Sequence, residues 1–241
     1  MQIKVISITP NPIDIIYNAA RQCYYKGYIG DYIDSDIVKN TFYFNNDVSY
    51  EDKIKLIQTC LKSGHTSIFE HASISFAISG LSRSCTHQLV RTRVGVTFSQ
   101  QSQRYVKVKN FSIDNCVIPN TVKNNLEANE RFSNILSALF NDIEKFNKDF
   151  PDIPDEDVRF LFPNALSSNI VWTVNFTALL KFFKERLCFR AQWEIRELAE
   201  NILEIMLQIA PEIFTFAGPV CNNGNKCNQG KLTCGKPITR K

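Results

Sequence analysis

The 241-residue chain has little excess of either charge and no long apolar run. Its 28 basic and 24 acidic residues leave a net charge of +4, and its isoelectric point is about 8.6. A nucleic-acid-binding domain more often has an isoelectric point above about 9 and clustered basic residues, so nucleic acid is not an expected partner. A small polyanion, such as a nucleotide phosphate, fits the mild basic excess better. Because no stretch of about 20 apolar residues occurs, we expect no membrane span.

Several motifs of nucleotide-binding and hydrolytic enzymes are also missing. The chain has neither a Walker-type Gly-Lys-Ser loop nor a Gly-x-Gly-x-x-Gly turn, so ATP hydrolysis and Rossmann-type cofactor binding have no support. It lacks the Gly-x-Ser-x-Gly elbow of serine hydrolases. Residues 1–8 lack the basic and apolar regions of a signal peptide. We therefore expect a cytoplasmic protein whose eight cysteines are free thiols.

What is present indicates strands early in the chain and helices later, which predicts an α+β fold. The expected strands are residues 5–8, 73–78 and 105–108. The expected helices are residues 13–23, 49–63, 82–91, 122–150 and 172–209, with a break in the last near residues 188–192. Residues 24–48 show no period and are expected to form loops and short elements. We predict one domain over residues 1–218 and a Cys-containing tail over residues 219–241.

The region from Gly64 to Tyr105 holds all three histidines and a cluster of arginines. These residues are His65, His71, His87, Arg83, Arg91, Arg93 and Arg104. Guanidinium groups present paired donors that match phosphate and carboxylate oxygens. The segment from Thr97 to Arg104 adds hydroxyl and amide groups that could read the edge of a uracil ring. The alternative interpretation is a solvated polar loop.

Metal and nucleophile chemistry are less well supported. His65 and His71 are six residues apart and do not share a helical face, which favours a structural or cofactor-contacting role over zinc binding. The tail cysteines Cys221, Cys227 and Cys234 contain no Cys-x-x-Cys pair, so we expect no metal site. Cys85 precedes His87 by two residues and would point away from it on a helix, so we expect Cys85 to be a small core residue.

Arg186 follows an apolar stretch that includes Leu180 and Phe183. An unpaired charge in such surroundings is costly. Either a buried ligand anion or a protein carboxylate would remove this cost, and the sequence leaves both open.

Five segments resemble, in the same order, motifs of the flavin-dependent thymidylate synthases. They are Gly64–His71, the pair Arg91–Arg93 and Ser102–Tyr105 with eight residues between, Arg159–Pro163, the late helical block of Trp172–Asn175 and Arg186–Ile195, and the Gly-Pro and Cys-rich tail. Together they cover about residues 60–236. The resemblance implies a homotetramer with a central, mostly antiparallel sheet flanked by helices, and active sites shared between subunits.

The same resemblance assigns roles residue by residue. The positions that would contact FAD are His65, Ser67, Arg91, Thr92, Arg93, Gln100, Asn175, Thr177 and Lys181. The positions that would surround dUMP are Gln88, Arg91, Gln100, Gln101, Ser102, Gln103, Arg104, Arg159 and Arg186. Two features depart from the family pattern. First, Thr92 stands where the family's Arg-His-Arg motif has its central His, and one extra residue lies between Arg93 and Ser102. Second, Thr177 and Lys181 stand where the family usually has Arg and Asn or His at the flavin site.

The implied reaction converts dUMP to dTMP with 5,10-methylenetetrahydrofolate as the carbon donor and NADPH as the reductant of FAD. Its chemistry uses no attacking cysteine, and Arg186 would stabilise negative charge that develops on N3 and O2 of the pyrimidine. Ser102 could instead be a nucleophile, but no obvious base accompanies it, so we favour binding. Two other interpretations are a flavoenzyme that methylates uracil in RNA and a non-catalytic nucleotide- or RNA-binding protein. The second predicts a colourless protein with salt-sensitive binding.

Overall fold

The computed structural model describes residues 1–36, 41–44, 47–106 and 112–236. Backbone packing divides the chain into two compact units, which we call unit 1 and unit 2. Unit 1 consists of Met1–Lys4, Ala77–Arg91 and Phe98–Val171, and unit 2 consists of Val5–Phe76, Thr92–Thr97 and Trp172–Lys241. The boundary between residues 218 and 219 stays a prediction.

A four-stranded antiparallel sheet has the strand order β1-β4-β6-β5. Its strands are β1 (Gln2–Ile8), β4 (Ser73–Ser82), β5 (Val96–Gln100) and β6 (Ser167–Asn175). Within unit 2, the Thr9 amide donates to Ser73 O at 2.9 Å, and the Asn175 amide donates to Gly95 O at 2.8 Å. Within unit 1, the Gln101 amide donates to Asn169 O at 2.9 Å. This sheet and the helices below confirm the predicted α+β class.

Alternating burial along β4 and β6 supplies the core of unit 2. Ile74 and Phe76 on β4 and Trp172 and Val174 on β6 are buried, whereas their neighbours along each strand are half-buried or exposed. The rings of Phe76 and Trp172 lie 6.0 Å apart, and Trp172 meets Phe182 edge-on at 5.0 Å. This period of two is the pattern of strands with one face against a core.

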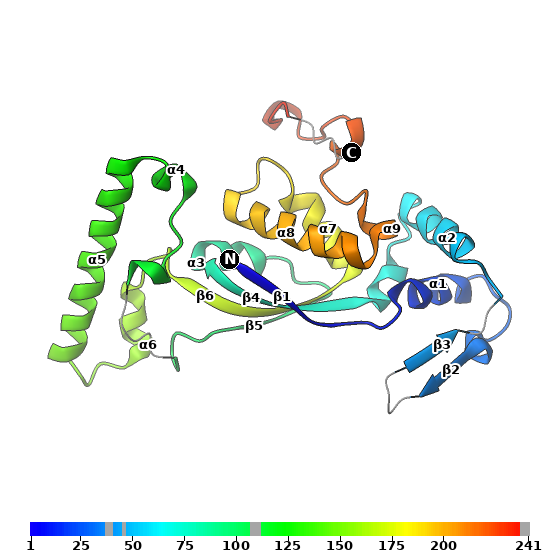
Figure 1. Cartoon of the computed structure of the whole chain (residues 1–241), viewed down its shortest axis with the longest axis horizontal. Coiled ribbons are helices and arrows are strands. Elements are labelled where there is room, and N and C mark those ends of the chain that lie inside the picture. Colours follow the sequence, from blue (N-terminus) through cyan, green and yellow to red (C-terminus); the bar gives the residue numbers. More distant parts are fainter. Residues whose placement is uncertain (37–40, 45–46, 107–111, 237–241) are drawn as a thin grey trace. The chain divides into compact units, whose positions relative to one another are not determined.

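Helices provide the rest of unit 2. Among the described residues they are α1 (Pro12–Gln22), α2 (Tyr50–Lys62), α7 (Phe176–Arg186), α8 (Trp193–Ile209) and α9 (Pro211–Phe214). Figure 1 shows α7 and α8 packed side by side. The ring of Phe214 on α9 meets those of Phe176 and Phe183 edge-on at 5.2 and 5.8 Å. The expected break in the long C-terminal helix is confirmed, because α7 ends at Arg186 and α8 begins at Trp193.

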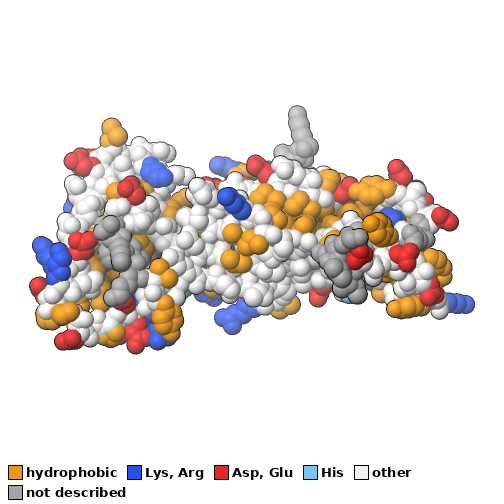
Figure 2. Space-filling view, turned by 60° about the horizontal axis from the view of Figure 1, so that its bottom comes forward, with side chains coloured by type: hydrophobic (Ala, Val, Ile, Leu, Met, Phe, Trp, Pro, Cys, Tyr) orange, Lys and Arg blue, Asp and Glu red, His pale blue; other side chains and the backbone are white. Residues whose placement is uncertain are grey.

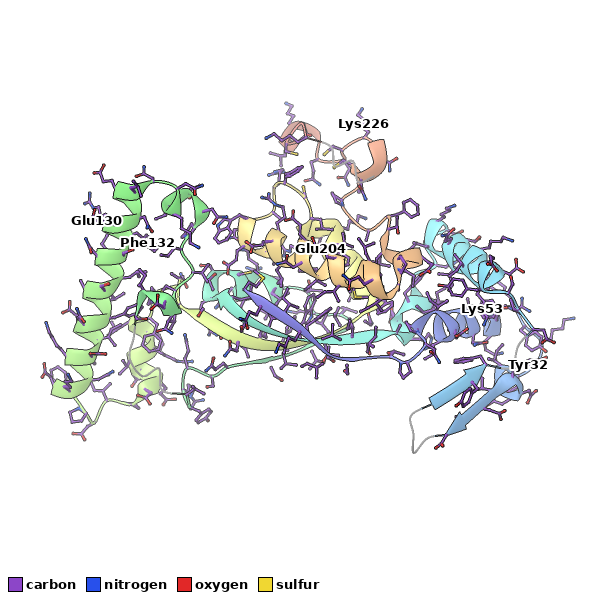
Figure 3. The ribbon with its side chains drawn as sticks, viewed as in Figure 1. Tyr32, Lys53, Glu130, Phe132, Glu204 and Lys226 are labelled. Atoms are coloured by element: carbon purple, nitrogen blue, oxygen red, sulfur yellow. The ribbon has the colours of Figure 1, made fainter. Side chains whose placement is uncertain are left out.

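The N-terminal part of unit 2 joins α1 to α2. Lys53 on α2, labelled in Figure 3, places its Nζ 2.7 Å from Asp14 Oδ1 on α1 and stacks over the Tyr17 ring. Ser49, at the start of the helix expected over residues 49–63, caps α2, because its hydroxyl accepts from the Asp52 amide at 3.2 Å. The expected short elements of residues 24–48 include an antiparallel hairpin of β2 (Ile33–Asp36) and β3 (Thr41–Phe44). Short 3-10 helices in unit 2 are Ile29–Tyr32, Ser67–His71, Asn222–Gly224 and Gly230–Leu232.

Unit 1 has a separate core around its longest helix. Its described helices are α3 (Arg83–Leu89), α4 (Asn120–Lys123), α5 (Leu126–Asp149) and α6 (Asp155–Val158), with 3-10 helices at Ile113–Asn115 and Arg159–Leu161. Buried residues of α5 pack against Val158 and Leu166, and Phe132, labelled in Figure 3, covers this cluster. Asn125 separates α4 from α5, because its side chain accepts from the Ala128 amide at 3.0 Å and starts a new helix.

Three sequence-based assignments were wrong. Residues 172–175 belong to β6, and the helix begins only at Phe176. The reason is that Ser167–Asn175 alternates buried and more exposed positions and pairs with β4 and β5 in the sheet. Residues 96–100 form β5 where a polar loop was expected. Tyr105 and Val106 lie in a turn and bend rather than in a strand, and residues 107–108 of that expected strand lie outside the described residues. Among the described residues, no helix is long and apolar enough to cross a membrane.

Candidate functional site

Two arginines of unit 1 contact one glutamate. Arg104 Nη2 lies 2.7 Å from Glu156 Oε2, and Arg159 Nε donates to the backbone oxygen of Glu156 at 3.0 Å. Burial lowers the pKa of Arg83, and the positive charge of Arg159 lowers it further. We call Arg83, Arg104 and Arg159 the arginine cluster. Its guanidinium groups offer paired, charged donors that suit a phosphate. The cavity that Arg104 lines also carries the carboxylates of Asp152, Asp155 and Glu156.

The segment before Arg104 is fixed by hydrogen bonds within unit 1. Gln100 Nε2 donates to Thr86 Oγ1 at 3.2 Å and to Ser168 Oγ at 3.1 Å, which holds its amide between α3 and β6. The Ser102 hydroxyl accepts from the Arg104 amide at 3.1 Å and so closes the turn. Gln100 and Ser102 are thus held in place before any ligand binds.

The remaining predicted residues of unit 1 lie beside these elements. Gln88 is half-buried on α3, and Arg91 is exposed just after this helix. Gln101 is exposed and Gln103 is half-buried in the segment that follows β5. Unit 1 therefore holds every predicted dUMP residue except Arg186, together with Arg91 and Gln100 of the predicted FAD set.

In unit 2, the first turn of α7 is tied to two other segments. Asn175 caps α7 by accepting from the Ala178 amide at 2.8 Å, while its own amide donates to Gly95 O. Gly95 has a φ of +72°, and an added Cβ would collide with the Asn175 side chain. Thr177 Oγ1 donates to Thr66 O at 2.6 Å. The predicted FAD positions Asn175 and Thr177 are thereby fixed against the segments that carry Thr92, Arg93 and Ser67.

A cavity of about 760 Å³ opens beside α7 within unit 2, and we call it the α7 cavity. The lining residues include Thr66, Thr177, Lys181, Lys184, Arg186 and Arg190. Its size is that of a small-molecule site. Four of these residues are cationic and Glu185 is the acidic residue among those that line it, so the cavity favours an anionic ligand. Arg186 is half-buried at the last residue of α7.

Thr177, Lys181 and Arg186 all line this cavity. His65 and Ser67 flank Thr66, and both are exposed. Thr92 is half-buried and Arg93 is exposed in the segment that leads to Gly95. Among the described residues, no group of three metal-ligating side chains is arranged to hold an ion.

The sequence placed Arg83 among the arginines of Gly64–Tyr105 but gave it no binding role, and it gave none to Glu156, Lys184 or Arg190. Arg83 offered a signal, because it is the first residue of α3. A cation at a helix N-terminus opposes the helix dipole and needs a nearby anion as compensation. Glu156 offered none, since it belongs to an acidic run, Asp155–Asp157, that reads as a solvated helix start.

The comparisons with known proteins agree with one another. A family model described as "Thymidylate synthase complementing protein" matches residues 4–212. A relative from Nitratidesulfovibrio vulgaris, named flavin-dependent thymidylate synthase, is 37% identical over 242 residues, covering 98% of this chain and 94% of the relative. A relative of the same name from Clostridium tetani is 35% identical over 252 residues, covering 100% of this chain and 96% of the relative. Another from Geobacter sulfurreducens is 37% identical over 236 residues, covering 98% of this chain and 94% of the relative. The chain therefore belongs to the thymidylate synthase complementing protein family, which is the family of the flavin-dependent thymidylate synthases.

Proposed function

We propose that this protein methylates dUMP reductively to dTMP, with 5,10-methylenetetrahydrofolate as the carbon donor and NADPH-reduced FAD as the hydride source. The observation that carries the proposal is the match of nearly the whole chain to relatives named flavin-dependent thymidylate synthase. The protein is accordingly an FAD-dependent enzyme of thymidylate synthesis. Its two basic regions, one in each unit, suit the anionic substrate and cofactor that this reaction requires.

The dUMP phosphate is assigned to the arginine cluster of unit 1. Arg104 and Arg159 supply charged donors there, and Ser102 and Gln103 directly precede Arg104. The amides of Gln88 and Gln101 offer both donors and acceptors for the uracil edge. Gln100 offers its Oε1 as an acceptor, because its Nε2 donates to Thr86 and Ser168. Arg91 completes the set as an exposed cation after α3. The fixed position of Gln100 supports this assignment, because a preorganised amide loses little freedom when a ligand binds.

FAD is assigned to the α7 cavity and to the segments tied to it. Lys181 supplies positive charge for the pyrophosphate, and Thr177 and Asn175 hold the first turn of α7 in place. His65, Ser67, Arg91, Thr92, Arg93 and Gln100 complete the assigned FAD set. Four cationic side chains in a cavity of about 760 Å³ fit the anionic part of this cofactor. When bound, FAD supplies the hydride for the methyl group.

Arg186 is assigned the catalytic role. Methylation at C5 of uracil requires that negative charge develop on N3 and O2, and a guanidinium group aimed at this edge stabilises it. One such donor typically contributes about 2.7–4 kcal/mol to a transition state. The half-buried position of Arg186 supports the role, because a charge removed from water interacts more strongly with a ligand.

We further propose a homotetramer whose active sites are shared between subunits, so that one nucleotide receives groups from more than one chain. Nucleotide biosynthesis places such an enzyme in the cytoplasm. On the face shown in Figure 2, Lys and Arg side chains are scattered among Asp and Glu. The small net charge of +4 favours a mononucleotide over a long nucleic acid as substrate.

The direct test is NADPH oxidation by the purified protein. The proposal predicts a yellow protein that oxidises NADPH faster when dUMP is added and forms dTMP only when methylenetetrahydrofolate is also present. Uridine in an RNA oligonucleotide should not replace dUMP. A colourless protein that FAD does not bind, or one that methylates RNA instead, would refute the proposal.

A further inference from the structure

Three thiols of the C-terminal tail line one small cavity in unit 2. The cavity measures about 250 Å³ and is lined by Cys221, Cys227 and Cys234, with Lys226, Thr233 and Lys236 among its other walls. We call it the tail cavity. All three cysteines are free thiols. Cys221 and Cys227 also line the α7 cavity, so this pair lies at both cavities.

The surroundings of Cys227 differ from those of the other thiols. A hydrogen bond from the Gln229 backbone lowers its pKa, and the Thr233 hydroxyl and the charge of Arg190 act in the same direction. Burial instead raises the pKa of Cys60, and that of Cys116 to about 11. Because the thiolate is the reactive form, we expect Cys227 to be oxidised before the other thiols of the tail cavity. It is also half-buried, whereas Cys221 is only 6% exposed.

We propose that Cys227 is an oxidation site and that Cys221 resolves it into a disulfide. Hydrogen peroxide is the oxidant. The Cys227 sulfur attacks one peroxide oxygen, the O–O bond breaks, and Cys227 becomes a sulfenic acid as water leaves. The Cys221 sulfur then attacks the Cys227 sulfur, the S–S bond forms, and the sulfenic hydroxyl leaves as a second water. Two thiols and one peroxide thus give one disulfide and two waters.

The geometry favours Cys221 over Cys234 as the resolving thiol. Cys221 and Cys227 share the walls of both cavities, whereas Cys234 lines the tail cavity and its Sγ donates to the Lys236 backbone oxygen at 3.6 Å. A disulfide is also favoured over a metal site, because among the described residues no three His, Cys, Asp or Glu side chains are arranged to hold a metal ion. The burial of Cys221 is compatible with its role, since it has to meet only Cys227.

This pairing would alter the wall of the α7 cavity. If that cavity holds FAD, as proposed above, oxidation of the tail should change FAD affinity. This last consequence rests on the proposed function, but the disulfide itself does not. The disulfide can therefore be tested without dUMP, FAD or turnover.

The test is peptide mapping of the full-length protein after treatment with hydrogen peroxide. Trypsin cleaves after Lys226 and Lys231, so Cys221, Cys227 and Cys234 fall in three different peptides. We expect the peptides of Cys221 and Cys227 to be linked, with loss of the mass of two hydrogens. Cys234→Ser should retain the link. Cys221→Ser should lose it and leave a sulfenic acid at Cys227 that dimedone traps.

Linkage of Cys227 to Cys234, or persistence of all three thiols at peroxide concentrations that oxidise exposed Cys23, would overturn the proposal. Because Cys23 is on the surface of unit 2 and far from the tail in sequence, it serves as an internal control for oxidant exposure. Failure of this experiment would leave the thymidylate synthase assignment unaffected, since no substrate enters it.

Discussion

Arg104 Nη2 lies 2.7 Å from Glu156 Oε2, and the backbone oxygen of Glu156 accepts from Arg159 Nε. One glutamate therefore orients two of the guanidinium groups assigned to the dUMP phosphate. Its carboxylate occupies one of the donor groups of Arg104. We expect the dUMP phosphate to exchange with this carboxylate at Arg104.

Replacing Glu156 with Gln should tighten dUMP binding. The change removes a competing negative charge, while the backbone contact to Arg159 remains. Because both side chains are about half-exposed, the pair contributes at most about 1 kcal/mol, so the gain should be up to about fivefold. Calorimetric titration of the FAD-loaded protein with dUMP measures it. Glu130→Gln, on the exposed side of α5 (Figure 3), is the matched control and should change nothing. Weaker binding by Glu156→Gln would argue against exchange at Arg104.

Arg186→Ala should reduce turnover much more than dUMP affinity. Loss of one preorganised donor to the developing charge costs roughly a factor of 100–1,000 in kcat. Arg196→Ala is the control, because Arg196 on α8 donates to Phe189 O in the segment before this helix and has no assigned role. Steady-state kinetics of dTMP formation, with dUMP binding measured separately, provide the comparison. An Arg186→Ala enzyme with normal kcat would remove the catalytic assignment.

Gly95→Ala should destabilise the protein and weaken FAD binding. Gly95 has a φ of +72° and Gly64 a φ of +77°. An added Cβ meets the Asn175 side chain at Gly95, whereas at Gly64 it meets nothing within 4 Å. Asn175 cannot yield without loss of its cap on α7. Gly64→Ala should therefore lose only the backbone term of about 1–2 kcal/mol, whereas Gly95→Ala loses that and part of a cap worth about 1 kcal/mol. Urea unfolding and FAD titration compare the two; equal losses would mean that the Asn175 contact contributes nothing.

Tyr50 gives a prediction at alkaline pH. Its hydroxyl donates to Glu212 on α9. Burial first, and then the hydrogen bond and charge of Glu212 and the charge of Asp14, raise its pKa to about 12. An unfolded Tyr titrates near pH 10. The neutral form is favoured in the folded state, so the stabilisation is complete below about pH 10 and is lost as the pH rises toward 12. The free energy of unfolding should fall more steeply over that window for the native protein than for Tyr50→Phe; parallel curves would contradict the assignment.

Local signals in the sequence predicted the elements whose causes are local. Ser49 with Asp52 marked the start of α2, and the alternation of Ile74, Phe76 and Ile78 marked β4. Strand β6 and strand β5 could not be recognised in this way. Residues 172–175 precede a helical pattern without a break, and Val96–Gln100 is largely polar. Both become strands because other strands pair with them, and strand propensity depends strongly on such neighbours.

The candidate site was predicted unevenly for a similar reason. Arg104 and Arg159 are 55 positions apart by residue number, and the resemblance placed both at the phosphate. Their common contact, Glu156, required the folded chain, since its acidic neighbours gave it no distinction. Lys184 and Arg190 likewise look like ordinary surface cations until α7 and the tail enclose a cavity around them.

The account depends on a pyrimidine nucleotide lying against the flavin. Titration of the FAD-loaded protein with dUMP, followed by visible absorption, tests this most directly. We predict a saturable change in the flavin bands, which Arg104→Ala shifts to higher dUMP concentration. Calorimetric binding of dUMP that leaves the flavin spectrum unchanged would contradict the account, because it would place the nucleotide away from the cofactor.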